Sequence, residues 1–284
     1  MILKTNGERL WDSLMEMATI GPGERGGSRR LALTDADIEG RNLFRKWADE
    51  AGCTFRLDTM GNLFVRRNGK NPEAPPVLAG SHLDTQPSGG RFDGILGVLG
   101  GLEVVRSLND HRIETESPVE IVVWTNEEGA RFYPAMMGSG VFSGIFDQSE
   151  IYTHLDPDGF TVEEELRRTK QLGDTPCKSF PIRAYYELHI EQGPILEAEN
   201  TKIGVVTGGQ GTYWTHITLQ GQGSHAGPTP MHLRKDPIMG ASRIITGLRE
   251  IVLKQPGAVG TVGRLETKPA SINSIPGQVF FTVD

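Results

Sequence analysis

Three short runs of apolar and β-branched residues constrain the fold of this chain more than any other feature of its sequence. They are Val77 to Ser81, Val119 to Trp124 and Tyr186 to Ile190, and a helix-compatible stretch from Gly94 to Leu108 separates the first two. Short apolar runs bounded by turn residues are typical of buried strands, and strands that alternate with helices form parallel sheets. The sequence therefore predicts an α/β fold with a mainly parallel sheet.

The residues before these runs predict two helices and a hairpin. Apolar side chains recur at near-helical spacing over residues 10–17. Thr34 followed by Asp37 resembles a capping box that opens a second helix, and Gly52 is a natural stop for that helix. Residues 55–65 read as a short extended hairpin.

The pattern changes after Tyr213, which indicates a second, smaller α+β domain. Its expected elements are a strictly alternating strand at 214–220, a helix at 237–253 and further strands at Val259 and Val279. The glycines at 208–211 are the expected hinge. We therefore predict one domain over residues 1–210 and a smaller one over residues 211–284.

Charge and cysteine content exclude several classes of protein. A net charge of −7 argues against a nucleic-acid binder that relies on phosphate contacts. Cys53 and Cys177 are the two cysteines and lie outside any CxxC pattern, so neither a disulfide framework nor a thiolate zinc site is expected. Residues 1–11 lack the apolar core of a signal peptide, and no run is long enough to span a membrane. We expect a cytoplasmic protein.

The first predicted strand ends in the segment GSHLDT, residues 80–85. Open α/β sheets bind ligands at the ends of their strands. His82 and Asp84 are two residues apart and project to the same side of a strand, so Asp84 could hydrogen-bond the ring of His82 and raise its basicity toward a metal. An HxD pattern by itself fits a purely structural role equally well.

Carboxylates follow in two further segments. Asp93 lies in a glycine-rich loop, and its two oxygens could bridge two cations; the alternative is that it caps the helix that begins near Gly94. Glu127 and Glu128 follow the second strand, and cations would offset the repulsion between adjacent carboxylates. One of them could bind metal while the other acts as general base; the alternative is two solvated acids in a surface loop.

The third predicted strand runs into HIEQGP, residues 189–194. Three predicted strand ends thus carry His, Asp, Glu, Glu and His. A purely structural role for all five residues is much less probable than for any one of them. Nitrogen and oxygen ligands without thiolates suit Zn, Mn or Co.

The remaining histidines give weaker signals. His111 and His154 lie in polar, turn-like segments and are expected at the surface, and His216 is expected to be exposed or half-buried on a strand. The segment GQGSH, residues 221–225, resembles a phosphate-binding loop only loosely because it lacks the GK[ST] ending. We do not expect nucleotide binding.

A family resemblance rests on six motifs in family order: GSHLDT, GGRFDGILGVLGGLE, WTNEEGARF, HIEQGP, GSHAGPTPM and NSIPG. Together they resemble the dinuclear metalloaminoacylase superfamily, and within it the branch of N-carbamoyl-L-amino-acid hydrolases, allantoate amidohydrolases and β-ureidopropionases. The resemblance covers essentially the whole chain. It implies a dinuclear zinc hydrolase catalytic domain with a smaller inserted lid and dimerisation domain.

The resemblance also implies a metal site. His82, Asp93 and His189 would ligate one divalent ion, and Asp93 would bridge to a second ion held by Glu128. Glu127 would be the general base. The implied cofactors are two ions, Zn or Mn/Co, with no organic cofactor.

Four further residues receive roles by the same resemblance. Asp84 would orient His82. His225, in the smaller domain, would stabilise the oxyanion, in this family usually in the site of a partner subunit of a homodimer. Gln192 and Asn273 would contact the substrate carboxylate.

The implied activity is hydrolysis of the ureido C–N bond of N-carbamoyl-L-amino acids, with allantoate or N-carbamoyl-β-alanine as alternative substrates. The chain stops at FFTVD, residues 280–284, within a strand pattern, so we expect a truncated sequence. The family supplies its last metal-ligating His and a substrate-binding Arg from residues further on. A truncated, non-catalytic protein that binds metal or dimerises is the hypothesis from another class.

Overall fold

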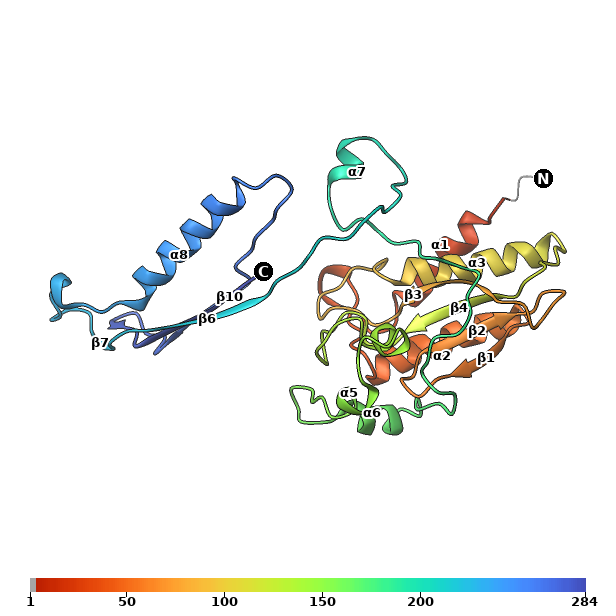
Figure 1. Cartoon of the computed structure of the whole chain (residues 1–284), viewed down its shortest axis with the longest axis horizontal. Coiled ribbons are helices and arrows are strands. Elements are labelled where there is room, and N and C mark those ends of the chain that lie inside the picture. The colour runs from red at the N-terminus through yellow and green to blue at the C-terminus, as the bar shows by residue number, and fades with distance from the viewer. Residues whose placement is uncertain (1–3) are drawn as a thin grey trace. The chain divides into compact units, whose positions relative to one another are not determined.

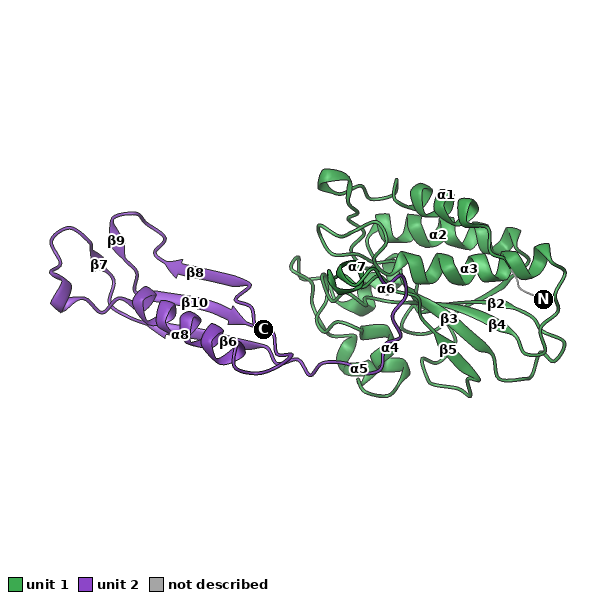
Figure 2. Cartoon of the chain, turned by 90° about the horizontal axis from the view of Figure 1, so that it is seen from above, with its two compact units in different colours: residues 1–200 green, residues 201–284 purple. Residues whose placement is uncertain are grey.

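The computed structural model describes residues 4–284. The chain divides into two compact units, Met1–Asn200 and Thr201–Asp284 (Figure 2). The expected boundary lay between residues 210 and 211. Residues 203–214 form no helix or strand. Their glycines were therefore the only sequence signal for the position of the boundary. The expectation about a signal peptide rests partly on residues 1–3, which lie outside the described residues. No helix of the described part is long and apolar enough to cross a bilayer.

Unit 1 is built on a five-stranded sheet with strand order β1-β2-β4-β3-β5 (Figure 1). The strands are β1 (Thr54–Leu57), β2 (Leu63–Arg67), β3 (Val77–His82), β4 (Val119–Trp124) and β5 (Ala184–Tyr186). β3 is parallel to β4 and to β5, whereas β2 is antiparallel to both of its neighbours. All strands except β2 therefore run in one direction, and the predicted α/β fold is confirmed with a mixed sheet.

The register of β3 and β4 brings their ends together. In the parallel ladder Val77 pairs with Val119 and His82 pairs with Trp124, so both strands finish at the same level of the sheet. Residues that follow the two strands therefore emerge at one edge. This edge carries the candidate site.

Three helices cover one face of the sheet (Figure 2). They are α1 (Gly7–Met17), α2 (Asp35–Glu50) and α3 (Ile95–Asp110). Their apolar faces bury Met17, Phe44 and Val98 against the Val123 side of β4. Burial of such side chains supplies most of the favourable free energy of folding.

Local signals explain the limits of α2. Thr34 is its N-cap and accepts a hydrogen bond from the N–H of Asp37, as the capping pattern predicted. Gly52 follows the helix with φ of +76°, a conformation that glycine adopts without strain.

Unit 1 also contains several shorter helical elements. They are α4 (Met137–Phe142), α5 (Gln148–Ile151), α6 (Val162–Arg168), α7 (Ile195–Ala198) and the 3₁₀ turn Glu24–Gly26. Phe142 of α4 packs with Phe64 and Trp124, whose side chains point away from α1 to α3.

Unit 2 has the α+β composition that the sequence predicts. It contains α8 (Pro237–Val252), a sheet of order β6-β10-β8, a small ladder of β7 and β9, and the 3₁₀ turn Met231–Leu233. The strands are β6 (Thr215–Gln220), β7 (Ser224–His225), β8 (Arg264–Lys268), β9 (Ser274–Ile275) and β10 (Gln278–Val283). α8 packs on this sheet through Ala241, which contacts the cluster of Val279 and Phe281.

Two predicted strands differ from the structure. The strand expected at 186–190 ends at Tyr186, because β5 pairs with only Val77 to Ala79 of β3. The strand expected near Val259 begins instead at Arg264, where a largely charged segment pairs with β10. Strand pairing is a tertiary property, which an apolar run alone does not fix.

Candidate metal centre and active site

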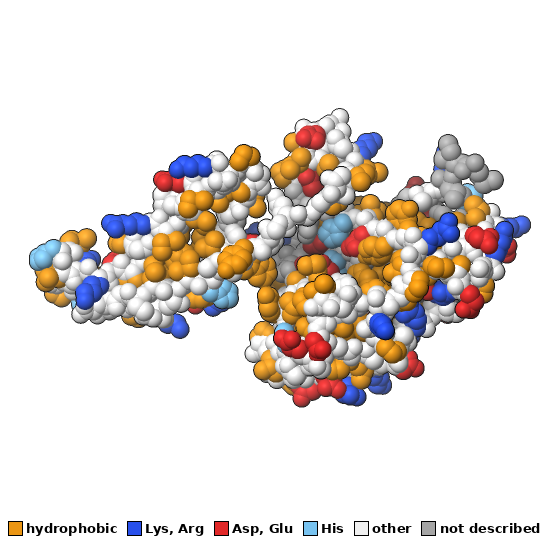
Figure 3. Space-filling view, in the orientation of Figure 1, with side chains coloured by type: hydrophobic (Ala, Val, Ile, Leu, Met, Phe, Trp, Pro, Cys, Tyr) orange, Lys and Arg blue, Asp and Glu red, His pale blue; other side chains and the backbone are white. Residues whose placement is uncertain are grey.

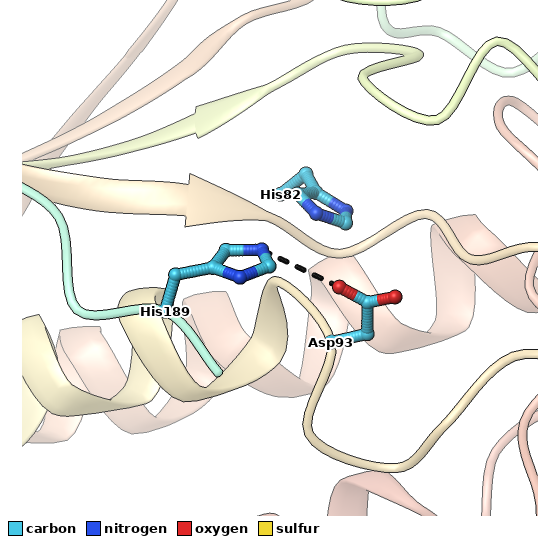
Figure 4. Close-up of side chains that lie close together, drawn as sticks. All are labelled: His82, Asp93 and His189. Atoms are coloured by element: carbon cyan, nitrogen blue, oxygen red, sulfur yellow. Dashed lines mark ion pairs between the residues drawn. The ribbon is translucent and has the colours of Figure 1, made fainter. Parts of the chain in front are cut away.

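Three of the predicted ligands meet at the edge where β3 ends. His82 is the last residue of β3, Asp93 lies in the loop before α3, and His189 lies in the segment after β5 (Figure 4). One ligand atom from each side chain lies within 4.8 Å of the other two, and Nε2 of His189 is 3.3 Å from Oδ1 of Asp93. Within residues 4–284 these three form the one His, Asp, Glu or Cys group with a geometry suited to a metal ion.

Main-chain carbonyls orient both imidazole rings. Nδ1 of His82 is 2.8 Å from the carbonyl oxygen of Asp84, and Nδ1 of His189 is 2.8 Å from that of Ile190. Because a carbonyl only accepts hydrogen bonds, each Nδ1 must carry the hydrogen. In the neutral rings Nε2 is then left with its lone pair, which is the arrangement found in metal-ligating histidines.

Asp93 is free to act as a ligand because it does not cap α3. The N-cap of that helix is Gly94, and the helix begins without a side-chain cap among the described residues. Oδ1 of Asp93 faces His189, while Oδ2 accepts a hydrogen bond of 2.6 Å from the amide of Gln192. The alternative that Asp93 is a helix cap is therefore excluded, and Gln192, expected at the substrate, contacts Asp93 here.

A glycine lets the loop approach the first histidine closely. Gly94 has φ of +72°, and a Cβ at this position would lie 2.4 Å from the ring of His82. Any other side chain would collide with the ring and strain the backbone. The sequence pattern did not mark Gly94 as a site residue; its only local signal is the Asp93-Gly94 pair before a helix.

Glu127 lies next to this group. Its Oε2 is 3.4 Å from Nε2 of His82, and its side chain keeps 31% of its surface exposed. Burial raises its pKa, the charge of His82 opposes that change, and the charge of Glu128 adds to it. A carboxylate with a raised pKa beside a candidate metal ligand is suited to accept a proton from water.

Glu128 takes a different position. Its carboxylate accepts hydrogen bonds from the main-chain N–H and the side-chain amide of Gln86, and it lies outside the His82 group. The structure therefore brings together His82, Asp93, His189 and Glu127 but does not bring Glu128 to them. The sequence motifs did not indicate a role for Gln86, although it directly follows GSHLDT.

Asp84 connects the ends of the two strands. Its buried carboxylate accepts hydrogen bonds from the main-chain N–H groups of Glu127 and Glu128, at 3.3 and 3.2 Å. The expected bond between its carboxylate and the His82 ring is replaced by the bond to its main-chain carbonyl, with the carboxylate oxygen 4.0 Å from Nδ1. Burial raises the pKa of Asp84 to about 7, while the charge of His82 opposes the rise.

The donor set fits a divalent cation. Burial lowers the pKa of His82, but the charges of Asp84 and Glu127 outweigh this effect and raise it overall. The surrounding carboxylates thus favour positive charge at this position, which a bound cation would supply. Two imidazole nitrogens and a carboxylate oxygen without a thiolate suit Zn, Mn or Co.

The surface of unit 1 has room for a small molecule beside this group. In the space-filling view, histidine and carboxylate side chains lie together at a hollow in this unit (Figure 3). A cavity of about 420 Å³ borders Glu127 and is lined in part by Trp124, Met136, Phe142 and Tyr185. Ligand pockets in proteins commonly have volumes of roughly 300–1,000 Å³.

Two further predicted residues lie together in unit 2. His225 is in β7 and pairs with Ser274 of β9, and the N–H of Ala226 donates to the carbonyl of Asn273. His225 is exposed, and its Nδ1 accepts a hydrogen bond from Gly227. The ladder thus places His225 close to Asn273.

Three other histidines have local partners. His111 is exposed with Nδ1 at the carbonyl of Ser107, and His154 is half-buried with Nδ1 at the carbonyl of Tyr133. His216 is exposed and its ring contacts Phe280. Glu191, in the HIEQGP segment, accepts hydrogen bonds from the start of α7.

The chain resembles known proteins over most of its length. The sequence model of the family described as Peptidase family M20/M25/M40 matches residues 78–278. The chain is 52% identical over 282 residues to an N-carbamoyl-L-amino-acid amidohydrolase of Rhizobium meliloti, an alignment that spans 99% of this chain and 68% of that protein. An allantoate deiminase of Arabidopsis thaliana is 35% identical, over 90% of this chain and 54% of its own length.

A solved structure is similar over the same extent. The crystal structure of a hydantoinase/carbamoylase-family amidase from Burkholderia multivorans is 58% identical and superimposes with a TM-score of 0.88, which covers 99% of this chain and 69% of that one. The similarity therefore extends over both units.

Proposed function

The chain belongs to the peptidase family M20/M25/M40, and on this premise we propose that it is a metal-dependent amidohydrolase of N-carbamoyl-L-amino acids. The reaction breaks the bond between the carbamoyl carbon and the α-nitrogen. Its products are the L-amino acid and carbamate, which decomposes to ammonia and carbon dioxide.

The observation that carries the proposal is the group of His82, Asp93 and His189 with Glu127 beside it. The first three would hold one divalent cation. A second divalent cation is proposed as well, which Asp93 and Glu128 would hold. Bound there, such a cation supplies Lewis acidity, which makes water a nucleophile near neutral pH and polarises a carbonyl.

Residues of the chain would carry the proton transfers. Glu127, with its raised pKa, takes a proton from the attacking water as the new C–O bond forms at the carbamoyl carbon. The same carboxyl then returns the proton to the α-nitrogen as the C–N bond breaks. His225 is proposed to stabilise the oxyanion that develops between these steps.

The substrate class is supported by the relatives and by the cavity beside Glu127. A cavity of about 420 Å³ has room for a small ureido acid. Gln192 and Asn273 remain the proposed contacts of the substrate carboxylate, with Asp84 as the residue that orients His82 through its carbonyl. The protein is further proposed to act as a cytoplasmic homodimer.

Ammonia release tests the proposal. The protein, dialysed against chelator and reloaded with Zn²⁺, Mn²⁺ or Co²⁺, is given N-carbamoyl-L-amino acids, their D-enantiomers, N-carbamoyl-β-alanine and allantoate. We expect stereospecific release of ammonia from the L-compounds.

Each other outcome has a distinct meaning. Faster hydrolysis of allantoate or N-carbamoyl-β-alanine would correct the substrate and leave the reaction class. Failure to release ammonia from all four classes, with metal bound, would favour the non-catalytic alternative.

A further inference from the structure

Arg30 is a fully buried arginine that lies behind the candidate metal site. Its exposed fraction is 0%, which is uncommon for this residue type. Desolvation of a guanidinium is costly, so a buried arginine needs hydrogen bonds and opposite charge around it. The positions of these partners indicate what Arg30 does.

The guanidinium joins the end of α1 to the segment after β3. Nε donates to the carbonyl of Leu83 at 3.3 Å, and Nη1 donates to the carbonyls of Met17 and Ile20 at 3.3 and 2.9 Å. Leu83 directly follows His82. The planar guanidinium of a single side chain is therefore hydrogen-bonded both to a helix end and to the metal-binding loop, and it holds the two together.

The main chain of Arg30 holds the same loop. Its N–H donates to Oγ1 of Thr85 at 2.8 Å, and its carbonyl accepts from the N–H of Thr85 at 2.8 Å. Leu83 and Thr85 flank Asp84, whose carbonyl orients the His82 ring. Arg30 thus restrains the residues on both sides of the carbonyl that sets the ring position.

The surroundings are shaped for this arginine. A Cβ at Gly40 of α2 would lie 3.3 Å from Cδ of Arg30, and a Cβ at Gly21 would lie 2.9 Å from its Cγ. The carboxylates whose charges act on it are Asp37 and Asp84. Nη2 lacks a hydrogen-bond partner among the described residues. An unsatisfied buried donor is costly, so the other contacts of Arg30 must offset this cost.

We propose that Arg30 is a positioning residue for metal binding: it holds the Leu83–Thr85 segment so that the Asp84 carbonyl keeps Nε2 of His82 directed at the Asp93 and His189 side chains. The inference rests on the metal-ligand role of His82 in the proposed function. Arg30 touches neither the ligand group nor the substrate cavity. Loss of Arg30 would lower the affinity for metal directly. It would lower turnover only because less metal is bound.

Cobalt titration of the metal-free full chain tests this role without any need for activity. The dissociation constant is read from the visible d–d absorption of Co²⁺, with the folded fraction of each variant measured by circular dichroism at the same temperature. We expect Arg30→Met to weaken Co²⁺ binding by about tenfold or more, the range known for residues that orient ligands. With metal at saturation, kcat should stay closer to wild type than the apparent metal affinity does.

Two further variants keep the test decisive if Arg30→Met does not fold. Arg30→Lys retains the charge but replaces the planar fork with a single ammonium, and should also weaken Co²⁺ binding. Thr85→Val has nearly the same volume and removes the oxygen that accepts from the Arg30 N–H. It should weaken binding in the same direction, and the folded fraction measured in parallel separates this effect from the stability lost when the buried Arg30 N–H loses its acceptor.

Arg67→Met is the matched control. Arg67 pairs with Val119 at the opposite end of β4, and its Nη1 also lacks a partner among the described residues. This variant should lose stability but keep Co²⁺ affinity within about twofold of wild type. Unchanged affinity in folded Arg30→Met, Arg30→Lys and Thr85→Val, or an equal loss in Arg67→Met, would overturn the proposal. Wild-type protein that binds no Co²⁺ would instead contradict the proposed function itself.

Discussion

Gly94 and His82 lie so close that a single added carbon at residue 94 would occupy the space of the imidazole ring. A Cβ built on Gly94 would be 2.4 Å from Cε1 and from Nε2 of His82. Nε2 lies 3.4 Å from Oε2 of Glu127 and is the ring nitrogen left available to a metal, because Nδ1 is bonded to the Asp84 carbonyl. The glycine before α3 is therefore part of the construction of the metal group.

Gly94→Ala is predicted to displace His82 and weaken metal binding by about tenfold or more. The matched control is Gly90→Ala in the same loop, where a Cβ would meet no described atom within 4 Å. Isothermal titration with Zn²⁺ measures both variants. Equal affinities for the two variants would contradict the prediction.

Glu127→Gln is predicted to lower kcat by roughly 10²–10⁴-fold, the contribution usual for a general base. The amide keeps the size of the side chain but cannot take a proton from water. Metal content, measured by atomic emission, should equal that of wild type. Glu163→Gln, which changes an exposed acid paired with Arg167, should leave kcat unaltered; retained activity in Glu127→Gln would rule out the assigned role.

Metal binding is predicted to stabilise the folded chain. A ligand that binds only the folded state at a free concentration of about 100 times Kd adds about 2.7 kcal/mol to the free energy of unfolding. Thermal denaturation with and without EDTA should therefore show a higher Tm for the Zn²⁺ form. The difference should disappear in His189→Ala and persist in His111→Ala, and a persisting difference in both would place the metal elsewhere.

Stability at acid pH is predicted to depend on Arg131. Hydrogen bonds from Arg168 and, after it, Arg131 hold the pKa of the buried Glu165 below its usual value. Since the folded pKa is lower than the unfolded value of about 4.3, the stabilisation is complete above that pH and is lost as pH falls through the folded pKa.

Arg131→Met should therefore lower the free energy of unfolding at pH 7 by about 3 kcal/mol and reduce its decline below pH ~4.3. Urea denaturation over a pH series measures both effects. Arg167→Met, which removes an exposed ion pair with Glu163, should change neither. An unchanged pH dependence in Arg131→Met would contradict the assignment.

The sequence patterns predicted β3, β4 and α2 well because each depends on signals local to the segment. The apolar runs at 77–82 and 119–124 become adjacent buried strands, and Thr34 caps α2 as expected. The convergence of His82 and Asp93 follows from where these elements end. Such features need no knowledge of distant partners.

Features that depend on partners far along the chain were not predictable in the same way. β5 ends at Tyr186 because the chain then turns toward α3, where the carbonyl of Leu188 lies 2.8 Å from the position of a Cβ on Gly97. The segment 264–268 forms a strand although it is largely charged, because it is an exposed edge beside β10. Arg30 gave no signal either, since arginine is usually a surface residue.

The contacts of the two imidazoles have an evolutionary consequence. Both rings are oriented by carbonyl oxygens of the polypeptide backbone, at Asp84 and Ile190. A carbonyl is present whatever side chain a codon specifies, so neutral drift at residue 190 cannot delete this acceptor. The ligand geometry is thereby buffered against mutation at that position, and selection acts instead on the residues that fix the path of the backbone.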